Sequence, residues 1–191
     1  MTKCGAIVLA AGASSRFGAD KRHHNFIHGN SILETTLGTY SDVFDQITVV
    51  LRPGERKLAR KLELKIKTKP LKFIFSENTH LGMGHSLAAG IGAANEWDYS
   101  FIGLGDMPYV LNETLLLLKQ NTDCNSIIIP EFSGQFGHPV GFPKRYFGEI
   151  SGLTGDQGAR KIIEANKDQL KIIKTKDKGV LLDIDNPTDL H

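Results

Sequence analysis

The chain alternates short apolar runs with longer stretches in which apolar residues recur at helical spacing. The short runs are rich in Val, Ile, Leu and Phe, which is typical of strands covered on both faces. The longer stretches predict helices: Ser31 with Glu34 forms an S-x-x-E capping pattern, and Asn112 is a further expected N-cap. The predicted strands are residues 6–10, 46–51, 72–75, 100–104 and 126–130, and the predicted helices are residues 31–40, 55–62, 85–94 and 112–120.

Alternation of strands and helices predicts a Rossmann-like, three-layer α/β sandwich with a mostly parallel central sheet and helices on both faces. Ligands of such sheets bind in loops beyond the carboxyl ends of the strands. The loops after Ala10, Phe75, Leu104 and Pro130 are therefore the expected place for chemistry.

The pattern changes after residue 130. Glycine-rich loops are expected to surround a short edge strand, and short helices are expected near residues 144–150 and 157–165. Strand-like runs follow at residues 170–175 and 180–184. No linker or repeat separates these elements from the rest, so we expect a single domain, 1–191, whose last third completes the same sheet.

A basic run over residues 55–72 favours a solvated outer helix over a nucleic-acid surface. Leu58, Ala59 and Leu62 share one helical face, and the alternation that follows through Leu64 predicts an edge segment. No aromatic residue is interleaved with these cations, as a base-stacking surface would require.

Composition narrows the class further. The chain has 191 residues, 40% of them hydrophobic and 23% charged, and its formal charge of +2 gives no argument for nucleic acid or a membrane as partner. Two cysteines, Cys4 and Cys124, make neither a disulfide framework nor a cysteine zinc site. The apolar run at residues 6–11 is too short for a secretory or membrane-spanning segment, so the expected location is cytoplasmic.

The loop after the first strand combines small residues with two cations, Arg16 and Lys21. Small residues let backbone N–H groups approach an anion, while arginine forks onto phosphate oxygens and lysine supplies a point charge. The spacing is neither that of a Walker A loop nor G-x-G-x-x-G, so a polyphosphate site and a solvated surface loop both remain open. The small residues are Gly12, Ser14, Ser15 and Gly18.

Other loops carry further candidates. Gly82 and Gly84 precede Ser86 at a helix entry, where Ser86 is either a cap or a ligand contact. Asp106 ends a buried strand, and such a carboxylate is costly unless a cation faces it, although a turn-capping role is the alternative.

Two acidic residues near the end, Asp183 and Asp185, lie two apart on a strand-like run and so are expected to share one face. A turn-capping role is again the alternative. In the glycine-rich region His138 is expected to be exposed, and Arg160 at a helix start is a plausible salt-bridge partner.

Five motifs resemble one known family. LAAGASSRFGADK (residues 9–21) resembles the signature of the nucleotidyltransferases that include the molybdopterin guanylyl- and cytidylyltransferases, and more distantly sugar-nucleotide pyrophosphorylases and methylerythritol-phosphate cytidylyltransferase. GMGHSLAAG, LGDMP, GHPV with LTGDQGAR, and DIDNPTDL follow in the expected order. The resemblance implies the nucleotide-diphospho-sugar-transferase type of fold.

The resemblance also implies a reaction: Mg²⁺-dependent transfer of CMP from CTP to the phosphate of molybdopterin or the molybdenum cofactor, with release of pyrophosphate. Ala10-Ala11-Gly12 favours CTP, because guanylyltransferases tend to carry a second glycine there. The alternatives are a GTP-using enzyme, a cytidylyltransferase for another small phosphorylated acceptor, and a non-catalytic cofactor carrier. A molybdoenzyme or its chaperone would be the partner that receives the product.

Residue roles carried over from the resemblance divide the chain into a nucleotide-binding part, 1–130, and an acceptor-binding, sheet-completing part, 131–191. Arg16, Lys21 and Asp106 would be catalytic, with Asp106 and either Asp185 or Asp183 holding the metal. The implied nucleotide-binding residues are Leu9, Ala10, Ala11, Gly12, Ser14, Ser15, Arg16, Gly18, Lys21, Gly82, Gly84 and Ser86, and the implied acceptor-binding residues are His138, Asp156, Gly158 and Arg160.

One stretch departs from the family pattern. After Lys21, where relatives carry an apolar segment, the chain has Arg22, His23 and His24, and His28 follows. These side chains either add anion contacts to the acceptor or decorate a surface loop.

Overall fold

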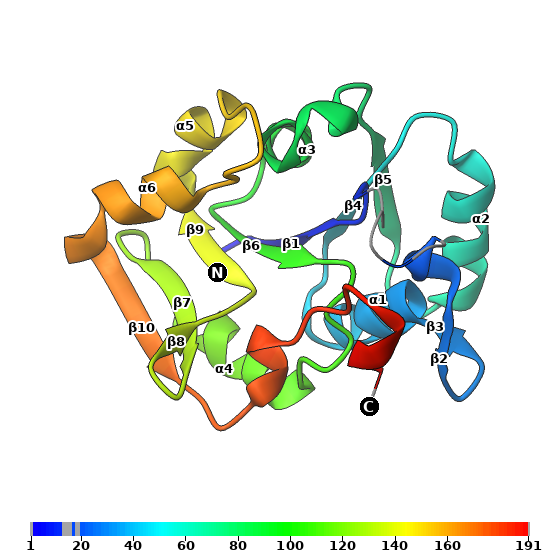
Figure 1. Ribbon diagram of the computed structural model, residues 1–191. Coiled ribbons are helices and arrows are strands. Elements are labelled where there is room, and N and C mark those ends of the chain that lie inside the picture. Colours follow the sequence, from blue (N-terminus) through cyan, green and yellow to red (C-terminus); the bar gives the residue numbers. More distant parts are fainter. Residues whose placement is uncertain (1, 13–16, 18–19, 191) are drawn as a thin grey trace.

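A central sheet of eight strands crosses the computed structural model, which describes residues 2–12, 17 and 20–190 (Figure 1). Along the sheet the order is β10-β7-β9-β6-β1-β4-β5, with β8 paired to β7. The strands are β1 (Cys4–Leu9), β4 (Ile47–Leu51), β5 (Leu71–Phe75), β6 (Tyr99–Leu104), β7 (Ile127–Phe132), β8 (Gln135–Phe136), β9 (Val140–Pro143) and β10 (Leu170–Lys174), and β2 (Asn25–Ile27) and β3 (Asn30–Ser31) form a separate ribbon.

Most neighbouring strands are parallel, as the sequence predicts. β1 runs parallel to both β4 and β6, β4 to β5, and β7 to β10. The strand predicted for the glycine-rich region is not an edge strand, because β9 lies antiparallel between β6 and β7. A Cβ at Gly141 would lie 2.6 Å from the Phe101 ring, so a glycine is what lets β9 fit against the aromatic side chains of β6.

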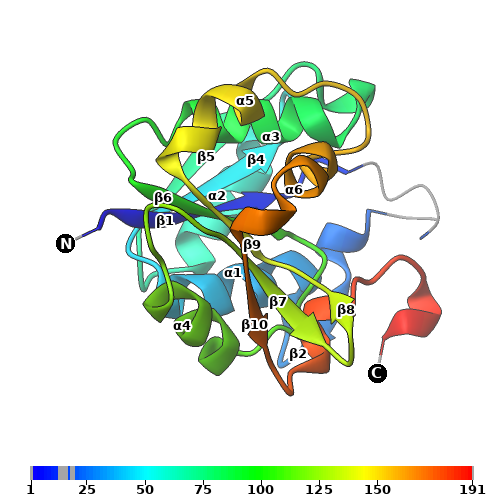
Figure 2. The ribbon, with the colours of Figure 1, turned by 90° about the vertical axis from the view of Figure 1, so that its left-hand side faces the viewer.

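Helices cover both faces of the sheet, which gives the predicted three layers. α3 and α5 lie on one face, and α1 and α4 lie on the other (Figure 2). Alternation along β1 fits these layers: Ala6 and Val8 belong to the core with α1, α2 and α4, whereas Ile7 packs in the core with α3, α5 and α6. The helices are α1 (Ile32–Val43), α2 (Arg56–Lys65), α3 (Met83–Gly92), α4 (Asn112–Gln120), α5 (Phe147–Ser151) and α6 (Arg160–Ala165).

Of the helix N-caps expected from the sequence, the one at Ser31 is confirmed and those at Ser86 and Asn112 are wrong. The capping box of α1 is present, since Ser31 Oγ accepts from Glu34 N at 3.3 Å and Glu34 Oε2 accepts from Ser31 N at 2.9 Å. By contrast, Leu111 rather than Asn112 is the N-cap of α4, and Ser86 lies buried inside α3 rather than capping it.

Further predictions for the outer elements were wrong in detail. α2 continues through Lys65, because its buried residues Leu58, Ala59 and Leu62 anchor a helix that extends past the point where alternation was expected to begin. The edge strand is β5, and α6 begins at Arg160 rather than at residue 157.

The strand predicted at residues 180–184 is also wrong. A 3₁₀ turn, Lys178–Leu181, begins this region, and the chain then crosses the strand ends without joining the sheet. Fully buried Ile184 packs with Phe17 and Ile32, and its N–H donates to the Asp106 carbonyl at 3.0 Å. Burial against the loops, instead of sheet pairing, explains the apolar character of this run.

Among the described residues, none of the helices is both long and apolar enough to span a bilayer.

Candidate active site

A cavity of about 670 Å³ opens where β1 and β6 end. Leu9 and Leu104 are paired at the ends of these two strands, so the segments that follow them leave the sheet side by side, and both segments line the cavity. It collects residues from segments far apart in sequence. The predicted nucleotide and metal residues that line it are Leu9, Ala10, Ala11, Gly12, Lys21, Gly82, Ser86, Asp106, Asp183 and Asp185.

The Lys21 ammonium lies among two of the acidic residues. Its Nζ is 2.7 Å from Asp106 Oδ2 and 3.0 Å from Asp185 Oδ1, and it donates to the Ile184 carbonyl at 2.6 Å. Burial disfavours the charge of this 7% exposed residue, but the hydrogen bonds and charges of the two aspartates outweigh burial and raise its pKa. Lys21 is therefore a cation at neutral pH, and it is the charge that the sequence requires opposite Asp106.

The cavity holds more negative charge than Lys21 neutralises. Oδ1 of Asp106 is buried and accepts no hydrogen bond from the described residues. Burial, together with the charges of Asp106 and Asp185, raises the pKa of Asp183. An orphaned carboxylate oxygen and a surplus of carboxylates fit a divalent cation.

Mg²⁺ prefers one or two carboxylates and completes its shell with phosphates and water. Within the part of the chain that the structure describes, no cluster of three or more acidic, histidine or cysteine side chains has the geometry of a metal site. The carboxylates of the cavity therefore suit a metal held jointly with a phosphate ligand better than a metal held by protein alone.

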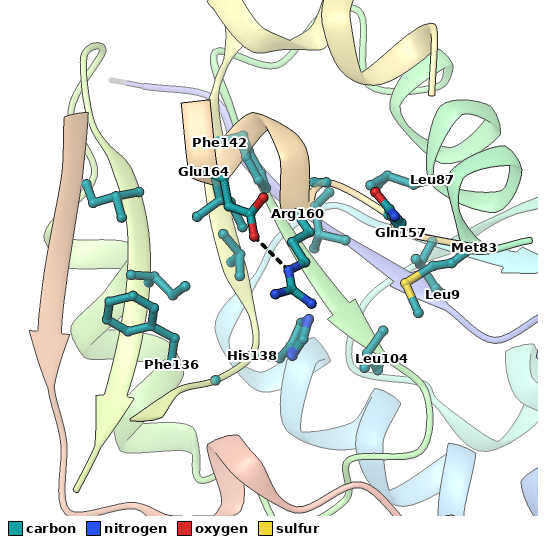
Figure 3. Close-up of a pocket in the computed structure, with 18 of the residues that line it drawn as sticks. Leu9, Met83, Leu87, Leu104, Phe136, His138, Phe142, Gln157, Arg160 and Glu164 are labelled. Atoms are coloured by element: carbon teal, nitrogen blue, oxygen red, sulfur yellow. Dashed lines mark hydrogen bonds and ion pairs between the residues drawn. The ribbon is translucent and has the colours of Figure 1, made fainter. Parts of the chain in front are cut away.

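A second, larger cavity of about 1380 Å³ adjoins the first. It lies between β9, β7, α3 and α6, with apolar side chains such as Phe136 and Phe142 beside the polar His138 and Arg160 (Figure 3). Four residues line both cavities: Leu9, Met83, Leu104 and Asp156.

The start of α3, residues 82–86, and the loop at residues 154–158 form one wall between the cavities. Gly84 N donates to the Gly155 carbonyl at 2.8 Å. At Gly82, where φ is +118°, a Cβ would lie 2.4 Å from Asp156 Oδ1 and from the Gly155 carbonyl carbon. Glycine is thus required at residue 82 both by the backbone angle and by the close approach of the second loop.

The MobA-like NTP transferase domain matches residues 6–170. The chain belongs to this family. The MobA-like match confirms the predicted nucleotidyltransferase at the level of the family.

Two curated relatives extend the comparison. The chain is 29% identical over 135 residues to a probable molybdenum cofactor guanylyltransferase of Natranaerobius thermophilus, a match that covers 69% of this chain and 62% of that protein, which is less than two thirds of its length. It is also 29% identical over 197 residues to the purine catabolism protein PucB of Bacillus subtilis, with 96% of this chain and 92% of that protein covered.

Solved structures confirm the predicted fold. Rv0371c of Mycobacterium tuberculosis H37Rv aligns with a TM-score of 0.80 at 24% identity and covers 98% of this chain and 95% of its own. A second structure of Rv0371c is a complex with manganese; it has a TM-score of 0.77 and 23% identity, and the coverage is 98% and 96%.

The acceptor residues implied for this MobA-like domain all line the larger cavity, and one of them, His138, differs from expectation. His138 is partly buried rather than exposed; burial lowers its pKa against the opposing charges of Asp106 and Asp183. Arg160 makes the salt bridge that the sequence suggested, with its Nε 2.8 Å from Glu164 Oε1 on the next helical turn.

Four implied residues of the first loop, Ser14, Ser15, Arg16 and Gly18, lie outside the described residues. Gly84 is described but does not line the smaller cavity. The pairing of Asp183 and Asp185 on one strand face was wrong, because the segment is not a strand, although both side chains reach the same cavity.

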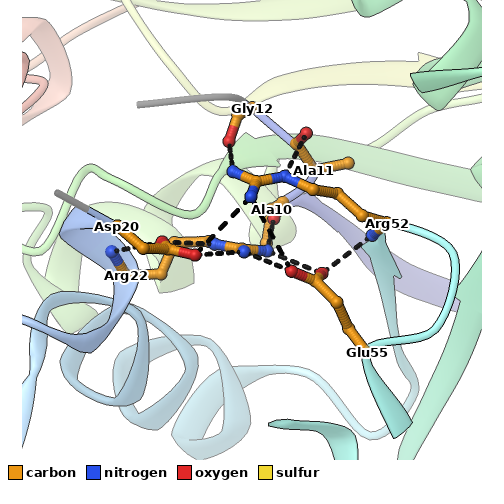
Figure 4. Close-up of polar contacts among 7 residues, drawn as sticks. All are labelled: Ala10, Ala11, Gly12, Asp20, Arg22, Arg52 and Glu55. Atoms are coloured by element: carbon orange, nitrogen blue, oxygen red, sulfur yellow. Dashed lines mark hydrogen bonds and ion pairs between the residues drawn. The ribbon is translucent and has the colours of Figure 1, made fainter. Parts of the chain in front are cut away.

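The departure after Lys21 separates into two parts. His23, His24 and His28 are exposed, which agrees with a decorated surface loop. Arg22 is neither exposed nor free for an anion: it is 3% exposed and donates to Asp20, Glu55 and the Ala10 carbonyl (Figure 4).

Sequence reasoning missed Arg52 and Glu55 altogether. Arg52, directly after β4, donates to the carbonyls of Ala11 and Gly12 (Figure 4). The one available signal was that a second cation and an acid follow the neighbouring strand in the sheet, at the edge where ligands bind.

Proposed function

We propose that this chain is a magnesium-dependent nucleotidyltransferase that transfers CMP from CTP to the phosphate of molybdopterin or the molybdenum cofactor. The observation that carries the proposal is the position of Lys21, Asp106 and Asp185 at the ends of β1 and β6, in a cavity that adjoins a second, larger one. A group-transfer enzyme needs two neighbouring sites, one for the donor and one for the acceptor.

The smaller cavity is proposed for the nucleotide. Lys21 would supply a positive charge to the triphosphate, and by family resemblance Arg16 would add a second. Binding of the phosphates then draws the Lys21 ammonium away from Asp106 and Asp185, whose oxygens become available to the metal. A bound Mg²⁺ would neutralise charge on the α-phosphate.

The reaction is a displacement at the α-phosphorus. An oxygen of the acceptor phosphate forms a bond to that phosphorus, the bond to the β-phosphate oxygen breaks, and pyrophosphate leaves with the electron pair. Because a phosphate monoester is already anionic near neutral pH, no side chain has to remove a proton. The protein's contribution is therefore positioning and charge neutralisation.

Different observations support the choice of metal ion and the choice of nucleotide. The two carboxylates and the orphaned Asp106 oxygen suit an oxygen-preferring divalent ion, and the manganese complex of Rv0371c supports a divalent metal. Ala10-Ala11-Gly12 supports CTP. The relative named as a probable molybdenum cofactor guanylyltransferase supports the alternative, GTP.

The acceptor is proposed to bind in the larger cavity. Its apolar walls suit a flat ring system, and His138, Asp156, Gly158 and Arg160 supply polar contacts at its edges. The name of the same guanylyltransferase relative supports a pterin phosphate. The division into a nucleotide part, 1–130, and an acceptor part, 131–191, applies only broadly, since Met83 and Asp156 line both cavities.

A nucleotide panel tests the proposal. The protein is incubated with Mg²⁺, molybdopterin and each of the four NTPs, and released pyrophosphate is measured. We expect release chiefly with CTP. Release chiefly with GTP would establish the guanylyltransferase alternative, and equal inactivity with all four nucleotides would favour a cofactor carrier.

A further inference from the structure

A cluster of charged side chains contacts the segment that follows β1. The family signature assigns no role to the residues of this cluster. The cluster consists of Asp20, Arg22, Arg52 and Glu55 (Figure 4). Two arginines face two carboxylates, so the cluster is neutral as a whole. Burial favours the neutral acids, but the hydrogen bonds and charge of Arg22 outweigh burial and lower the pKa values of Asp20 and Glu55.

Arg22 has no donor left for a ligand. Its Nε donates to Asp20 Oδ1 at 2.8 Å, and Nη2 donates to Asp20 Oδ2 at 2.5 Å and to Glu55 Oε1. Its Nη1 donates to Glu55 Oε2 at 2.8 Å and to the Ala10 carbonyl at 2.6 Å. These five contacts use the five N–H groups of a guanidinium.

The two arginines together hold three successive carbonyls. Arg22 binds that of Ala10, and Arg52 binds those of Ala11, at 3.2 Å, and Gly12. Successive carbonyls of an extended strand point in opposite directions, so holding three of them at one cluster bends the chain out of the strand. The last strand-like bond is Ala10 N to the Val50 carbonyl, at 2.9 Å.

A fixed carbonyl also fixes the N–H of the same peptide group, since the two are antiparallel across a planar trans peptide. The N–H groups of Ala11 and Gly12 therefore point away from the arginines that hold their partner carbonyls. Both residues line the smaller cavity. Backbone N–H groups in succession are suited to binding an anion or a polar ligand edge.

We propose that Arg22, braced by Asp20 and Glu55 and assisted by Arg52, is a positioning residue that sets NTP affinity by fixing the backbone of residues 10–12. The inference rests on the proposed function, because it concerns the nucleotide site of that reaction. Arg22 and Arg52 both line the smaller cavity. Because all five N–H groups of Arg22 are used on Asp20, Glu55 and the Ala10 carbonyl, its effect on NTP binding passes through that carbonyl.

Arg22→Lys is the first test, because lysine keeps the charge but has three donors instead of five. The measurements are the Kd for CTP and GTP by calorimetry without acceptor, and kcat and KM for both substrates. We expect Kd and KM for the preferred NTP to rise about tenfold, the equivalent of about 1.4 kcal/mol. The acceptor KM should stay within about twofold of wild type.

Glu55→Gln is the second variant, and it weakens the support of Arg22 without changing a residue that lines the smaller cavity. Glu55 is not among the described residues that line the smaller cavity, so any effect on NTP binding must pass through the arginines. We expect a rise in the NTP Kd in the same direction as for Arg22→Lys, with the two effects less than additive in the double variant.

Arg56→Lys is the matched control, since Arg56 is an exposed cation on the same side of the molecule that lies 5.7 Å from the Phe75 ring centre. It should bind NTP as wild type does. The thermal transition of each variant gives its unfolding temperature, and all binding is measured below that temperature. A loss of NTP affinity then cannot be caused by unfolding of the variant.

Unchanged NTP affinity in folded Arg22→Lys and Glu55→Gln, whatever their stability, would overturn the inference. So would a loss in Arg22→Lys that Glu55→Gln does not share. If wild-type protein itself binds no NTP, the proposed function fails; if wild type binds NTP and both variants bind it equally well, only this inference fails.

Discussion

Two neighbouring residues, Lys21 and Arg22, enter two charged clusters of opposite character. Lys21 joins Asp106 and Asp185 beside a further acid, Asp183, and one oxygen of Asp106 is left without a hydrogen bond from the described residues. Arg22 joins a cluster in which positive and negative charges balance and all five of its N–H groups are used.

The difference between them separates a ligand site from a structural support. A balanced cluster with its donors used has nothing left to bind, and its value lies in the backbone it holds. A cluster in which, among the described residues, the acids outnumber the lysine and one buried oxygen lacks a hydrogen bond is suited to binding a ligand.

The largest effect is expected from Asp106→Asn. The amide keeps the shape of the side chain but removes the charge that would hold the metal. We expect kcat to fall at least about 100-fold, on the scale seen when one group that stabilises developing charge is removed. Thermal unfolding should show a folded protein, and Mn²⁺ binding followed by electron paramagnetic resonance should weaken.

Asp45→Asn is the control for that variant, because Asp45 is an exposed acid that holds a lysine, Lys69, at 2.7 Å but lies away from both cavities. It should retain full activity. A fully active Asp106→Asn would remove the metal assignment.

Lys21→Met should weaken NTP binding and strengthen metal binding. Without the ammonium, the KM for NTP should rise about tenfold, as expected for the loss of a charged hydrogen bond. In the absence of nucleotide, however, Mn²⁺ should bind about fivefold more tightly, because Lys21 no longer competes for the Asp106 and Asp185 oxygens.

The Mn²⁺ affinity of Lys21→Met is measured by titration in the absence of nucleotide. Lys69→Met is the control and should bind Mn²⁺ as wild type does. Unchanged or weaker Mn²⁺ binding by Lys21→Met would mean that the lysine does not share these oxygens with a metal.

The smallest effect is expected on stability, from Glu55→Gln. The pKa of Glu55 is lowered in the folded protein, so its contribution is fully present above the unfolded value and is lost as pH falls through the folded one. At pH 7 we expect a loss of about 1–2 kcal/mol, between the values for surface and buried pairs.

Denaturant unfolding across pH measures that loss. The difference from wild type should begin to shrink as pH falls through the unfolded pKa of a glutamate, about 4.3, and should vanish below the lower folded pKa. Glu164→Gln, in an exposed pair with Arg160, should change stability by less than about 0.5 kcal/mol. A pH-independent loss in Glu55→Gln would show that its charge does not stabilise the cluster.

The sequence predicts the sheet and its helices because those elements carry their own periodicity. It predicted the five strands of the central sheet that begin within the first 130 residues, which are continuous apolar runs, but not the short ribbon of β2 and β3. It misplaced the strand at residues 180–184, because burial of Ile184 against loops gives the same apolar signal as burial in a sheet.

Within the site, motif resemblance indicated Lys21, Asp106 and the terminal acids, which line one cavity. It did not indicate the support of residues 10–12. Arg52 and Glu55 reach that segment only through the folding of β4 next to β1, a contact between residues about 40 positions apart that no local pattern records.

The contact between the Gly84 N–H and the Gly155 carbonyl has a consequence for engineering this protein. The two segments share a backbone hydrogen bond, and their close approach leaves no room for a Cβ at residue 82. Neither segment is a free module. If residues 82–86 are replaced by those of a relative, we expect the wall to keep its packing only when residues 154–158 come from the same relative.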